Sequence, residues 1–455
     1  MGTACSTPGE GARDGGAEFD AARIDGAMDG GPGLHDSGAL DGRAEDGSDA
    51  DGSIVDADAN VHDGGGVDAD TSEPARYFGF VPLAKDPATG VDSFTRQEIA
   101  EDANMVTLHF DFFGIPWAEF ARGEPLPAAW VAEMDRVSNL AAELGLPVFL
   151  ALTPLHGTRD KLAPNASGEA ELVLDQDFGV SCEVISGRPD AAVITDGYAA
   201  YVRYMIDRFA PRFVALSIEV NLYEKNCRLR GAAAAWAPME NMLNAVYASE
   251  HARHPNLPIF NTFKLEDLWD ASEASDACFG YMTSCLDENL ARFSGLKNDV
   301  FALSTYPLVP FVNNGASLPE AWFSAVSSRV SVPLAIAETG YQASSIQVEL
   351  ASGDCYEALP AGTADQEAWV KRVIREASQR EMPFVTWWSN RDLMPTAISG
   401  DCHCASTDPW CGFLNPLPST LSLLYKFFGS MGLRDVGGTP RAAHAPWAAE
   451  VAKYR

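Results

Sequence analysis

The sequence lacks any uninterrupted run of about 18 apolar residues, which is the length that a bilayer-spanning helix requires. Basic residues are also few: 32 Lys and Arg stand against 64 Asp and Glu, which gives a formal net charge of −32. Nucleic acids and anionic membrane surfaces bind clustered Lys and Arg side chains. We therefore predict no transmembrane segment and no nucleic-acid partner, and we expect an uncharged substrate.

The first 75 residues lack lysine and, apart from Phe19, aromatic side chains. They contain 18 Asp or Glu and 3 Arg, so they cannot bury enough apolar surface to offset the entropy of ordering. We predict a disordered acidic tether over residues 1–75 and one folded domain over residues 76–455. Repeated Asp-Gly steps suggest calcium loops, but the Glu that closes an EF-hand loop is missing, and we predict no metal site and no cofactor.

Cysteine is unevenly distributed along the chain. Cys5 stands alone in the tether, and the predicted domain has an even number of cysteines, namely Cys182, Cys227, Cys278, Cys285, Cys355, Cys402, Cys404 and Cys411. An even number in loop-like segments favours disulfides and an oxidising compartment. The alternative is a zinc site at Cys402, Cys404 and Cys411 with His403, but the paired C-x2-C spacing is absent, so we favour disulfides.

The residues around Cys5, Met-Gly-Thr-Ala-Cys-Ser, resemble the end of a bacterial lipoprotein signal, in which a lipidated cysteine precedes a polar tether. The positively charged and apolar regions of such a signal are absent from this sequence. The same residues match the short N-myristoylation pattern Met-Gly-x-x-x-Ser. We expect an extracellular or cell-surface protein, with a lipid anchor at Cys5 as a hypothesis.

From residue 76 onward, short apolar runs alternate with amphipathic stretches, a pattern typical of a parallel sheet with helical connections. The predicted strands are residues 77–83, 105–112, 147–153, 213–220, 258–262, 300–306, 333–338 and 383–388. Eight such units favour a (β/α)8 TIM barrel, which needs ~250 residues. A doubly wound open sheet is the alternative, but no Gly-x-Gly-x-x-Gly turn follows the first strand.

Two predicted strands carry a glutamate near the end of an apolar run: Glu219 on the fourth and Glu338 on the seventh. In the fourth strand, alternation places Ala215, Ser217, Glu219 and Asn221 on one face and Val214, Leu216, Ile218 and Val220 on the other. We expect the small and polar face to point into the barrel. Both glutamates would then lie at the carboxyl ends of the strands, where barrel enzymes have their active sites.

Other polar and aromatic side chains are predicted at the same rim. These candidate substrate contacts are His109, Asp111, Asn221, Asn261, Tyr306, Trp387 and Trp388. Because consecutive strand residues point to opposite faces, at most one of the two tryptophans is expected to face the site. Two carboxylates beside aromatic side chains are typical of glycoside hydrolysis, in which one protonates the leaving oxygen and the other attacks or stabilises the anomeric carbon.

Three short motifs, Ser-Thr-Tyr-Pro at 304–307, Ala-Glu-Thr-Gly-Tyr at 337–341 and Thr-Trp-Trp at 386–388, resemble those of clan A retaining glycoside hydrolases. Within that clan, residues 76 to about 430 are most similar to the arabinogalactan endo-β-1,4-galactanase type. The resemblance implies that Glu219 is the acid/base, Glu338 the nucleophile and Tyr306 the hydrogen-bond partner that orients the nucleophile. It also implies that Trp387 or Trp388 forms the platform beneath the sugar.

The chain departs from that family's pattern in two places. Ile218 stands where the clan has an Asn that holds the substrate 2-hydroxyl, so an enzyme would need Asn221, Asn261 or His109 to supply this hydrogen bond. An Arg near the second strand is also absent from residues 106–117. These departures leave open a second interpretation, a carbohydrate-binding pseudoenzyme on the same barrel.

A third interpretation is a metal-dependent hydrolase that uses His109, Asp111 and His156. We do not favour it, because no two His occur at ligand spacing at a strand end. The prediction is therefore an exported glycosidase, expected to be a monomer, that cleaves a β-linked polysaccharide or oligosaccharide with retention. Retention requires the two carboxyl groups to be roughly 5 Å apart.

Overall fold

The computed structural model describes residues 76–83, 93–111, 113–175, 178–270, 283–307, 318–349, 353–402, 411, 414 and 419–455. The predicted tether with Cys5 lies outside these ranges, as do Cys278, His403 and Cys404. None of the helices within these ranges combines the length and the apolarity that crossing a bilayer takes.

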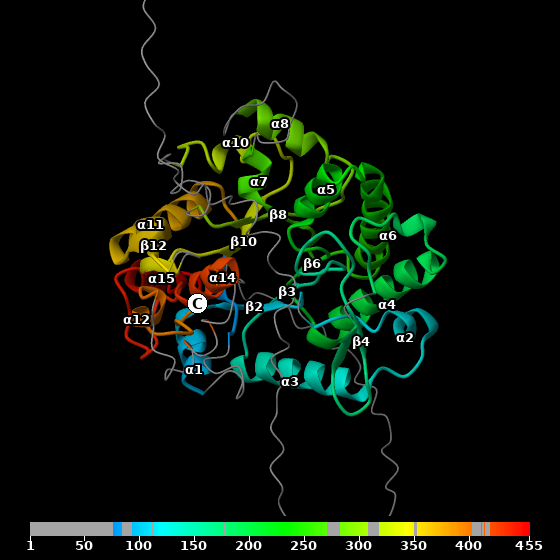
Figure 1. Ribbon diagram of the computed structural model, residues 1–455, viewed down its shortest axis with the longest axis horizontal. Coiled ribbons are helices and arrows are strands. Elements are labelled where there is room, and N and C mark those ends of the chain that lie inside the picture. Colours follow the sequence, from blue (N-terminus) through cyan, green and yellow to red (C-terminus); the bar gives the residue numbers. More distant parts are fainter. Residues whose placement is uncertain are drawn as a thin grey trace, which may run out of the picture.

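The central feature is a parallel sheet that curves round on itself, with helices surrounding it (Figure 1). In chain order its strands are β1 (Tyr77–Phe80), β2 (Met105–His109), β3 (Val148–Ala151), β6 (Phe213–Ala215), β7 (Ile259–Phe260), β8 (Thr262–Lys264), β9 (Phe301–Thr305), β10 (Leu334–Thr339) and β13 (Phe384–Trp387). Their order in the sheet is β7-β6-β3-β2-β1-β13-β10-β9-β8. This nearly closed parallel barrel confirms the predicted fold class.

The two edges of the sheet lie at the strand predicted over residues 258–262: β7 falls within that range, and β8 begins at its last residue. β7 pairs with β6, β8 pairs with β9, and one residue, Asn261, separates β7 from β8. The break has a local cause: Asn298 Oδ1 accepts hydrogen bonds from the backbone N–H of Asn261 at 2.7 Å and from its side-chain amide at 3.0 Å. Two short segments therefore fill the fifth position of the barrel.

Aromatic and small side chains fill the barrel interior. This interior cluster consists of Tyr77, Met105, Phe149, Ala151, Phe213, Ala215, Ile218, Phe260, Val300, Ala302, Ala335, Ala337 and Phe384. The ring of Phe384 packs against Phe213 and Phe149, with ring centroids 4.7 and 4.9 Å apart, respectively. On β10 the inward residues are Ala335 and Ala337, which leave room for the polar side chains that follow at the carboxyl end.

One prediction about facing is wrong. Ile218, expected on the outer face with Val214 and Leu216, belongs to the interior cluster. The reason is that β6 ends at Ala215, so the strict alternation of faces ends three residues before Ile218. The fourth strand is thus much shorter than the apolar run in the sequence.

The helices of the described ranges are α1 (Ser93–Asp102), α2 (Trp117–Arg122), α3 (Ala128–Leu144), α4 (Ala191–Phe209), α5 (Val220–Leu229), α6 (Trp236–Arg253), α7 (Leu265–Trp269), α8 (Thr283–Ala291), α10 (Ser324–Ser327), α11 (Thr363–Gln379), α12 (Thr396–Ser399), α14 (Ser419–Gly429) and α15 (His444–Val451). α3 illustrates why they form: Trp130, Met134, Val137, Leu140 and Leu144 recur at helical spacing and are buried. The helix stops at a Gly in the left-handed conformation, which no larger residue adopts as easily.

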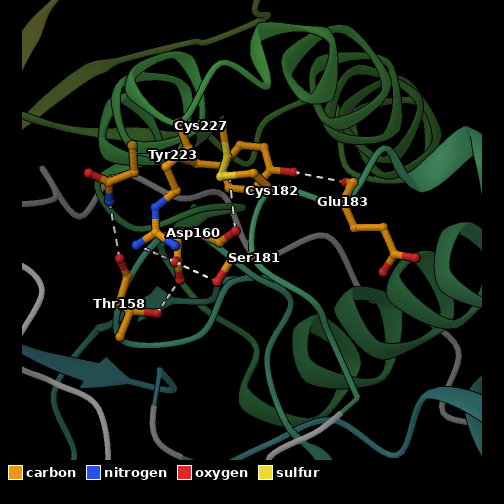
Figure 2. Close-up of a disulfide and its surroundings, with 9 residues drawn as sticks. Thr158, Asp160, Ser181, Cys182, Glu183, Tyr223 and Cys227 are labelled. Carbon is orange, nitrogen blue, oxygen red and sulfur yellow. Dashed lines mark hydrogen bonds and ion pairs between the residues drawn. A yellow bond between two sulfur atoms is a disulfide. The ribbon is translucent and has the colours of Figure 1, made fainter.

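Two antiparallel hairpins, which the sequence did not predict, extend from the barrel. They are β4 (Asn165–Ser167) with β5 (Val173–Asp175), and β11 (Ser344–Glu349) with β12 (Cys355–Gly362). Disulfides join Cys182 to Cys227 (Figure 2) and Cys355 to Cys402, and Cys285 and Cys411 are also disulfide-bonded. These bonds confirm the prediction of disulfides and remove Cys402 and Cys411 from the zinc alternative.

Candidate active site at the carboxyl ends of the strands

Glu338 lies near the carboxyl end of β10, a strand in which every residue is buried. The hydroxyl of Tyr306, which directly follows β9, donates a hydrogen bond to Glu338 Oε2 at 3.1 Å. His109, the last residue of β2, places Nε2 3.6 Å from Glu338 Oε1. Glu338 is thus a buried carboxyl held between side chains from two other strands.

A second group of charges adjoins the first. Asp111 lies two residues beyond β2, and its Oδ1 is 4.0 Å from His109 Nδ1. Its Oδ2 accepts a hydrogen bond of 3.1 Å from the guanidinium of Arg159. The Nε of Arg159 is in turn 3.8 Å from Glu219 Oε2. A continuous set of ionisable groups therefore runs from Glu219 through Arg159 and Asp111 to His109, which adjoins Glu338.

Glu219 occupies a strand-to-helix turn and not a strand. It has left-handed backbone angles, φ 49° and ψ 47°, and it immediately precedes α5. Its backbone N–H donates a hydrogen bond of 2.8 Å to Thr262 Oγ1 on β8. Glu219 was expected to point inward because residues alternate along a strand, and this reason is wrong because Glu219 is not in a strand. Its carboxylate nevertheless lies 3.8 Å from Arg159.

Glu219 and Glu338 both influence the pKa values of Arg159 and Tyr306. Burial works to lower the pKa of the Arg159 guanidinium, but Asp111, Glu219 and Glu338 together raise it above its ordinary value. Burial and the charges of Glu338 and Glu219 raise the pKa of the Tyr306 phenol well above its ordinary value. In the structure, Arg159 Nε is 3.8 Å from Glu219 Oε2, and the Tyr306 hydroxyl oxygen is 3.1 Å from Glu338 Oε2.

Burial shifts the pKa values of two neighbouring groups in opposite directions, because it favours the neutral form of each. It raises the pKa of Glu338 to about 7, with Asp111 adding to the rise and with Arg159 and the Tyr306 hydrogen bond opposing it. It lowers the pKa of His109 to about 4. His109 is therefore neutral near pH 7, while Glu338 can gain or lose a proton there.

Several buried polar atoms at this rim lack a hydrogen-bond partner among the described residues. They are both ring nitrogens of His109, Asp111 Oδ1, Glu338 Oε1 and Trp388 Nε1. Buried polar atoms normally have partners, and five such atoms in one place are unusual. They are suited to hydrogen bonds with the hydroxyl groups of a ligand.

The two consecutive tryptophans have different environments. Trp388 is partly buried at the rim, with its ring centroid 5.3 Å from that of His109 and 5.0 Å from that of Phe428 on α14. Trp387 is fully buried in the core under the helices, and its indole N–H donates to the backbone oxygen of Met431 at 2.8 Å. Only Trp388 is therefore kept as a candidate platform for a sugar, and the assignment of Trp387 is withdrawn.

The two asparagine candidates bind the protein itself. The side-chain amide of Asn221 donates to the backbone oxygen of Lys264 at 3.0 Å and accepts from its backbone N–H at 2.8 Å. Asn221 thus ties α5 to the end of β8. Asn261 lies at the break between β7 and β8, and its side chain donates a hydrogen bond to Asn298. Because Asn298 precedes β9, Asn261 lies near the amino end of β9. Neither placement suits a substrate contact.

Three residues near the site have no counterpart in the predictions. They are Arg159, Phe428 and Glu266, whose Oε1 accepts hydrogen bonds from the Thr305 hydroxyl at 2.7 Å and from the Tyr306 backbone N–H at 2.8 Å. Burial raises the pKa of Glu266 to about 7. Arg159 and Glu266 follow strand ends in the sequence, which is the one signal that could have pointed to them.

The metal alternative finds no support in the geometry. His156 Nδ1 is 2.9 Å from Thr158 Oγ1 and belongs to the loop that carries Arg159. Within the residues that the structure describes, no three His, Cys, Asp or Glu side chains are grouped so that they could hold a metal ion.

Comparison with known proteins gives matches in structure alone. No family model and no curated protein match this sequence. Two crystal structures of a GH5_18 protein from Bifidobacterium longum subsp. longum, one of them in complex with Manb1-4GlcNAc, align with a TM-score of 0.51 and 15% identity. The alignments cover 84% of this chain and 78% or 80% of theirs. An exo-beta-1,4-mannosidase from Opitutaceae bacterium strain TAV5 aligns at a TM-score of 0.49 with 12% identity, over 84% of this chain and 59% of that one.

At these identities the likeness concerns the fold. The chain shares its barrel fold with these GH5_18 proteins, and the finer resemblance to the galactanase type stays a prediction.

Proposed function

We propose that this protein is a retaining glycoside hydrolase that cleaves a β-linked polysaccharide or oligosaccharide. The observation that carries the proposal is the connection between Glu219, which precedes α5, and Glu338 on β10. Arg159 lies 3.8 Å from Glu219 and 3.1 Å from Asp111, and His109 lies 4.0 Å from Asp111 and 3.6 Å from Glu338. Two carboxyl groups at one barrel rim suffice for hydrolysis by double displacement, without a cofactor.

In the proposed mechanism, Glu338 is the nucleophile and Glu219 the acid/base. Glu219 gives its proton to the glycosidic oxygen while the ionised Glu338 forms a bond to the anomeric carbon and the leaving sugar departs. Glu219 then removes a proton from water, which attacks the anomeric carbon and releases Glu338. The Tyr306 hydroxyl, 3.1 Å from Glu338 Oε2, stabilises the ionised carboxylate and keeps it oriented.

Several features favour a neutral sugar as substrate. Beside Glu338 lies a neutral His109, which offers hydrogen bonds, and beside His109 lies the indole of Trp388, which offers an apolar face. The acidic composition disfavours anionic polymers. The neighbours named for Manb1-4GlcNAc and for β-1,4-mannosidase activity put β-mannosides first among candidates, and the motif resemblance adds β-1,4-galactan. The disulfides fit the expected export, and a monomer and a lipid anchor at Cys5 stay hypotheses.

A carbohydrate-binding pseudoenzyme is the second candidate, and one observation favours it. Ile218, where the clan has the Asn that holds the 2-hydroxyl, is fully buried in the interior cluster. Asn221 and Asn261, the possible replacements, bond to the protein. Of the three residues proposed to supply this hydrogen bond, only His109 remains beside Glu338.

Incubation with a panel of mannans, galactans, xylans and glucans separates the two functions. Reducing-sugar release by the wild type that falls at least ~1,000-fold in both Glu338→Gln and Glu219→Gln supports the enzyme. Glu143→Gln, at an exposed carboxylate on α3, is the matched control and should keep full activity. Binding of a glycan without release by the wild type would support the pseudoenzyme instead.

A further inference from the structure

Arg159 has a backbone conformation that its surroundings must impose. Its φ is 55°, in the left-handed region, although it is neither Gly nor Asn. This conformation costs an L-residue roughly 1–2 kcal/mol, so neighbouring contacts have to hold it. Its guanidinium is nevertheless directed at Asp111 and Glu219, with separations of 3.1 and 3.8 Å.

The next residue, Asp160, provides those contacts. It is buried, and its Oδ1 accepts a hydrogen bond of 2.5 Å from the Thr158 hydroxyl. Its Oδ2 accepts a bond of 2.8 Å from the Ser181 hydroxyl and lies 3.0 Å from Arg230. Figure 2 shows the Asp160 carboxylate between Thr158 and Ser181. The proposed mechanism makes no use of this buried carboxylate.

A disulfide fastens the same loop to the helix that follows Glu219. The backbone N–H of Cys182 donates to the Asp160 carbonyl at 2.6 Å, and Cys182 is bonded to Cys227 on α5 (Figure 2). Asn226, also on α5, donates to the Thr158 carbonyl at 3.2 Å. Residues 158–160 and Glu219 are therefore both fixed to α5, which sets the position of Arg159 relative to Glu219.

We propose that Asp160 and the Cys182–Cys227 disulfide form a clamp that holds Arg159 against Glu219 and Asp111, which makes Asp160 a positioning residue for the acid/base. The clamp acts through Arg159 and touches neither the substrate nor the reacting atoms. Its kinetic consequences rest on the proposed glycosidase function.

A double-mutant cycle tests whether Asp160 acts through Arg159. Asp160→Ala should lower kcat/KM roughly 10- to 100-fold, mainly through kcat, because a displaced Arg159 misplaces the acid/base. In an Arg159→Met background the same change should have almost no further effect. Asp160→Asn, whose carboxamide can accept a hydrogen bond from one of the Thr158 and Ser181 hydroxyls and donate one to the other, should restore most of kcat/KM. If the losses of kcat/KM caused by Asp160→Ala and by Arg159→Met were fully additive in the double variant, the proposal would be overturned.

The second disulfide is a matched control. Cys182–Cys227 and Cys355–Cys402 span 45 and 47 residues, so removing either by paired Cys→Ser changes should lower the melting temperature by similar amounts. The loss of kcat/KM caused by removing Cys182–Cys227 should disappear in the Arg159→Met background, whereas any loss caused by removing Cys355–Cys402 should persist there. Persistence of both losses would contradict the clamp.

A readout that does not need activity separates this inference from the proposed function. In 15N-labelled wild-type protein, the buried Arg159 Nε–H should exchange slowly with solvent, and its protection should fall in Asp160→Ala and in the variant without Cys182–Cys227. That result supports the clamp even if no glycan is cleaved. Unchanged protection in both variants would overturn the clamp even in an active glycosidase.

Discussion

At the scale of single residues, two neighbours of Glu338 act on its pKa in opposite directions. Burial and then the charge of Asp111 raise this pKa to about 7, whereas the hydrogen bond from Tyr306 lowers it. The nucleophile Glu338 must be ionised, so kcat/KM is expected to rise with pH through about 7. The acid/base Glu219 must be protonated, so kcat/KM is expected to fall again at the higher pH where Glu219 loses its proton.

Asp111→Asn removes a negative charge beside Glu338 and should move this rise to lower pH. Tyr306→Phe removes a donor to the ionised carboxylate and should move it to higher pH. The measurement is kcat/KM for the wild type and both variants from about pH 4 to about pH 9, a range that covers the ordinary carboxyl and imidazole pKa values. Shifts in the same direction for both variants would contradict this description of the site.

The consecutive tryptophans provide a second pair of substitutions. Trp388→Ala removes the candidate platform and should lower kcat/KM tenfold or more, a loss of about 1.4 kcal/mol, with little change in stability. Trp387→Ala removes a buried core ring and its hydrogen bond to Met431, and it should cost about 3–5 kcal/mol of unfolding free energy. Urea unfolding and steady-state kinetics on both variants check this, and the opposite pattern would reassign the two residues.

How well the sequence predicted the candidate site depends on where each residue lies. His109 and Glu338 end or nearly end apolar strands, so position in the pattern was enough to place them. Arg159 was not predicted, because it lies in an irregular loop whose conformation is set by Asp160 and a disulfide distant in sequence. The periodicity of apolar residues and the amino-acid composition carry no information about such contacts.

At the scale of secondary-structure elements, the junction of β6 and α5 is strained at Glu219, where φ is 49°. Replacement by Gly relieves this strain and replacement by Ala does not, although both remove the carboxylate. Glu219→Gly is therefore expected to be more stable than Glu219→Ala by about 1 kcal/mol in urea unfolding, the reverse of the order in an ordinary helix. Equal or reversed stabilities would show that the left-handed turn is absent.

A comparison of α3 with the junction of β6 and α5 shows which elements a sequence can predict. α3 follows from local signals, namely the helical spacing of its apolar residues and the flanking Pro127 and Gly145. The apolar run 213–220 predicted one strand, but only its first three residues pair as β6. The rest forms a turn fixed by Thr262 from a distant strand, and tertiary contacts of this kind override local propensity.

At the scale of the whole molecule, the C-terminal segment closes the structure against the beginning of the barrel. Arg434 donates two hydrogen bonds to the Asp102 carboxylate, at 2.7 and 3.0 Å, and His444 Nε2 is 2.9 Å from it. The indole N–H of Trp447 donates to the Asp102 backbone oxygen at 3.0 Å. These contacts join the end of α1 to residues more than three hundred positions later.

Asp102→Ala is expected to cost about 3 kcal/mol of unfolding free energy, because Arg434 is left without its buried partner. Burial raises the pKa of Asp102, but hydrogen bonds to His444 and Arg434 outweigh it and keep the pKa below its ordinary value. The stabilisation is therefore complete above the ordinary Asp pKa of about 4 and is lost as pH falls through the lower folded value.

Urea unfolding of Asp102→Ala at neutral and acidic pH measures both effects. Asp207→Ala, which removes one partner of an exposed ion pair with Arg253, is the control and should cost under about 1 kcal/mol. A stability difference between wild type and Asp102→Ala that does not shrink at low pH would contradict the role of the Asp102 charge.

The anomeric configuration of the first product tests the central claim most directly. Proton NMR of a β-linked substrate during the first turnovers should show the β-anomer appearing before mutarotation produces the α-anomer, because Glu338 and Glu219 act in two displacements. If the α-anomer appeared first, the two carboxyl groups would be working by single displacement, and Glu338 would not be a nucleophile.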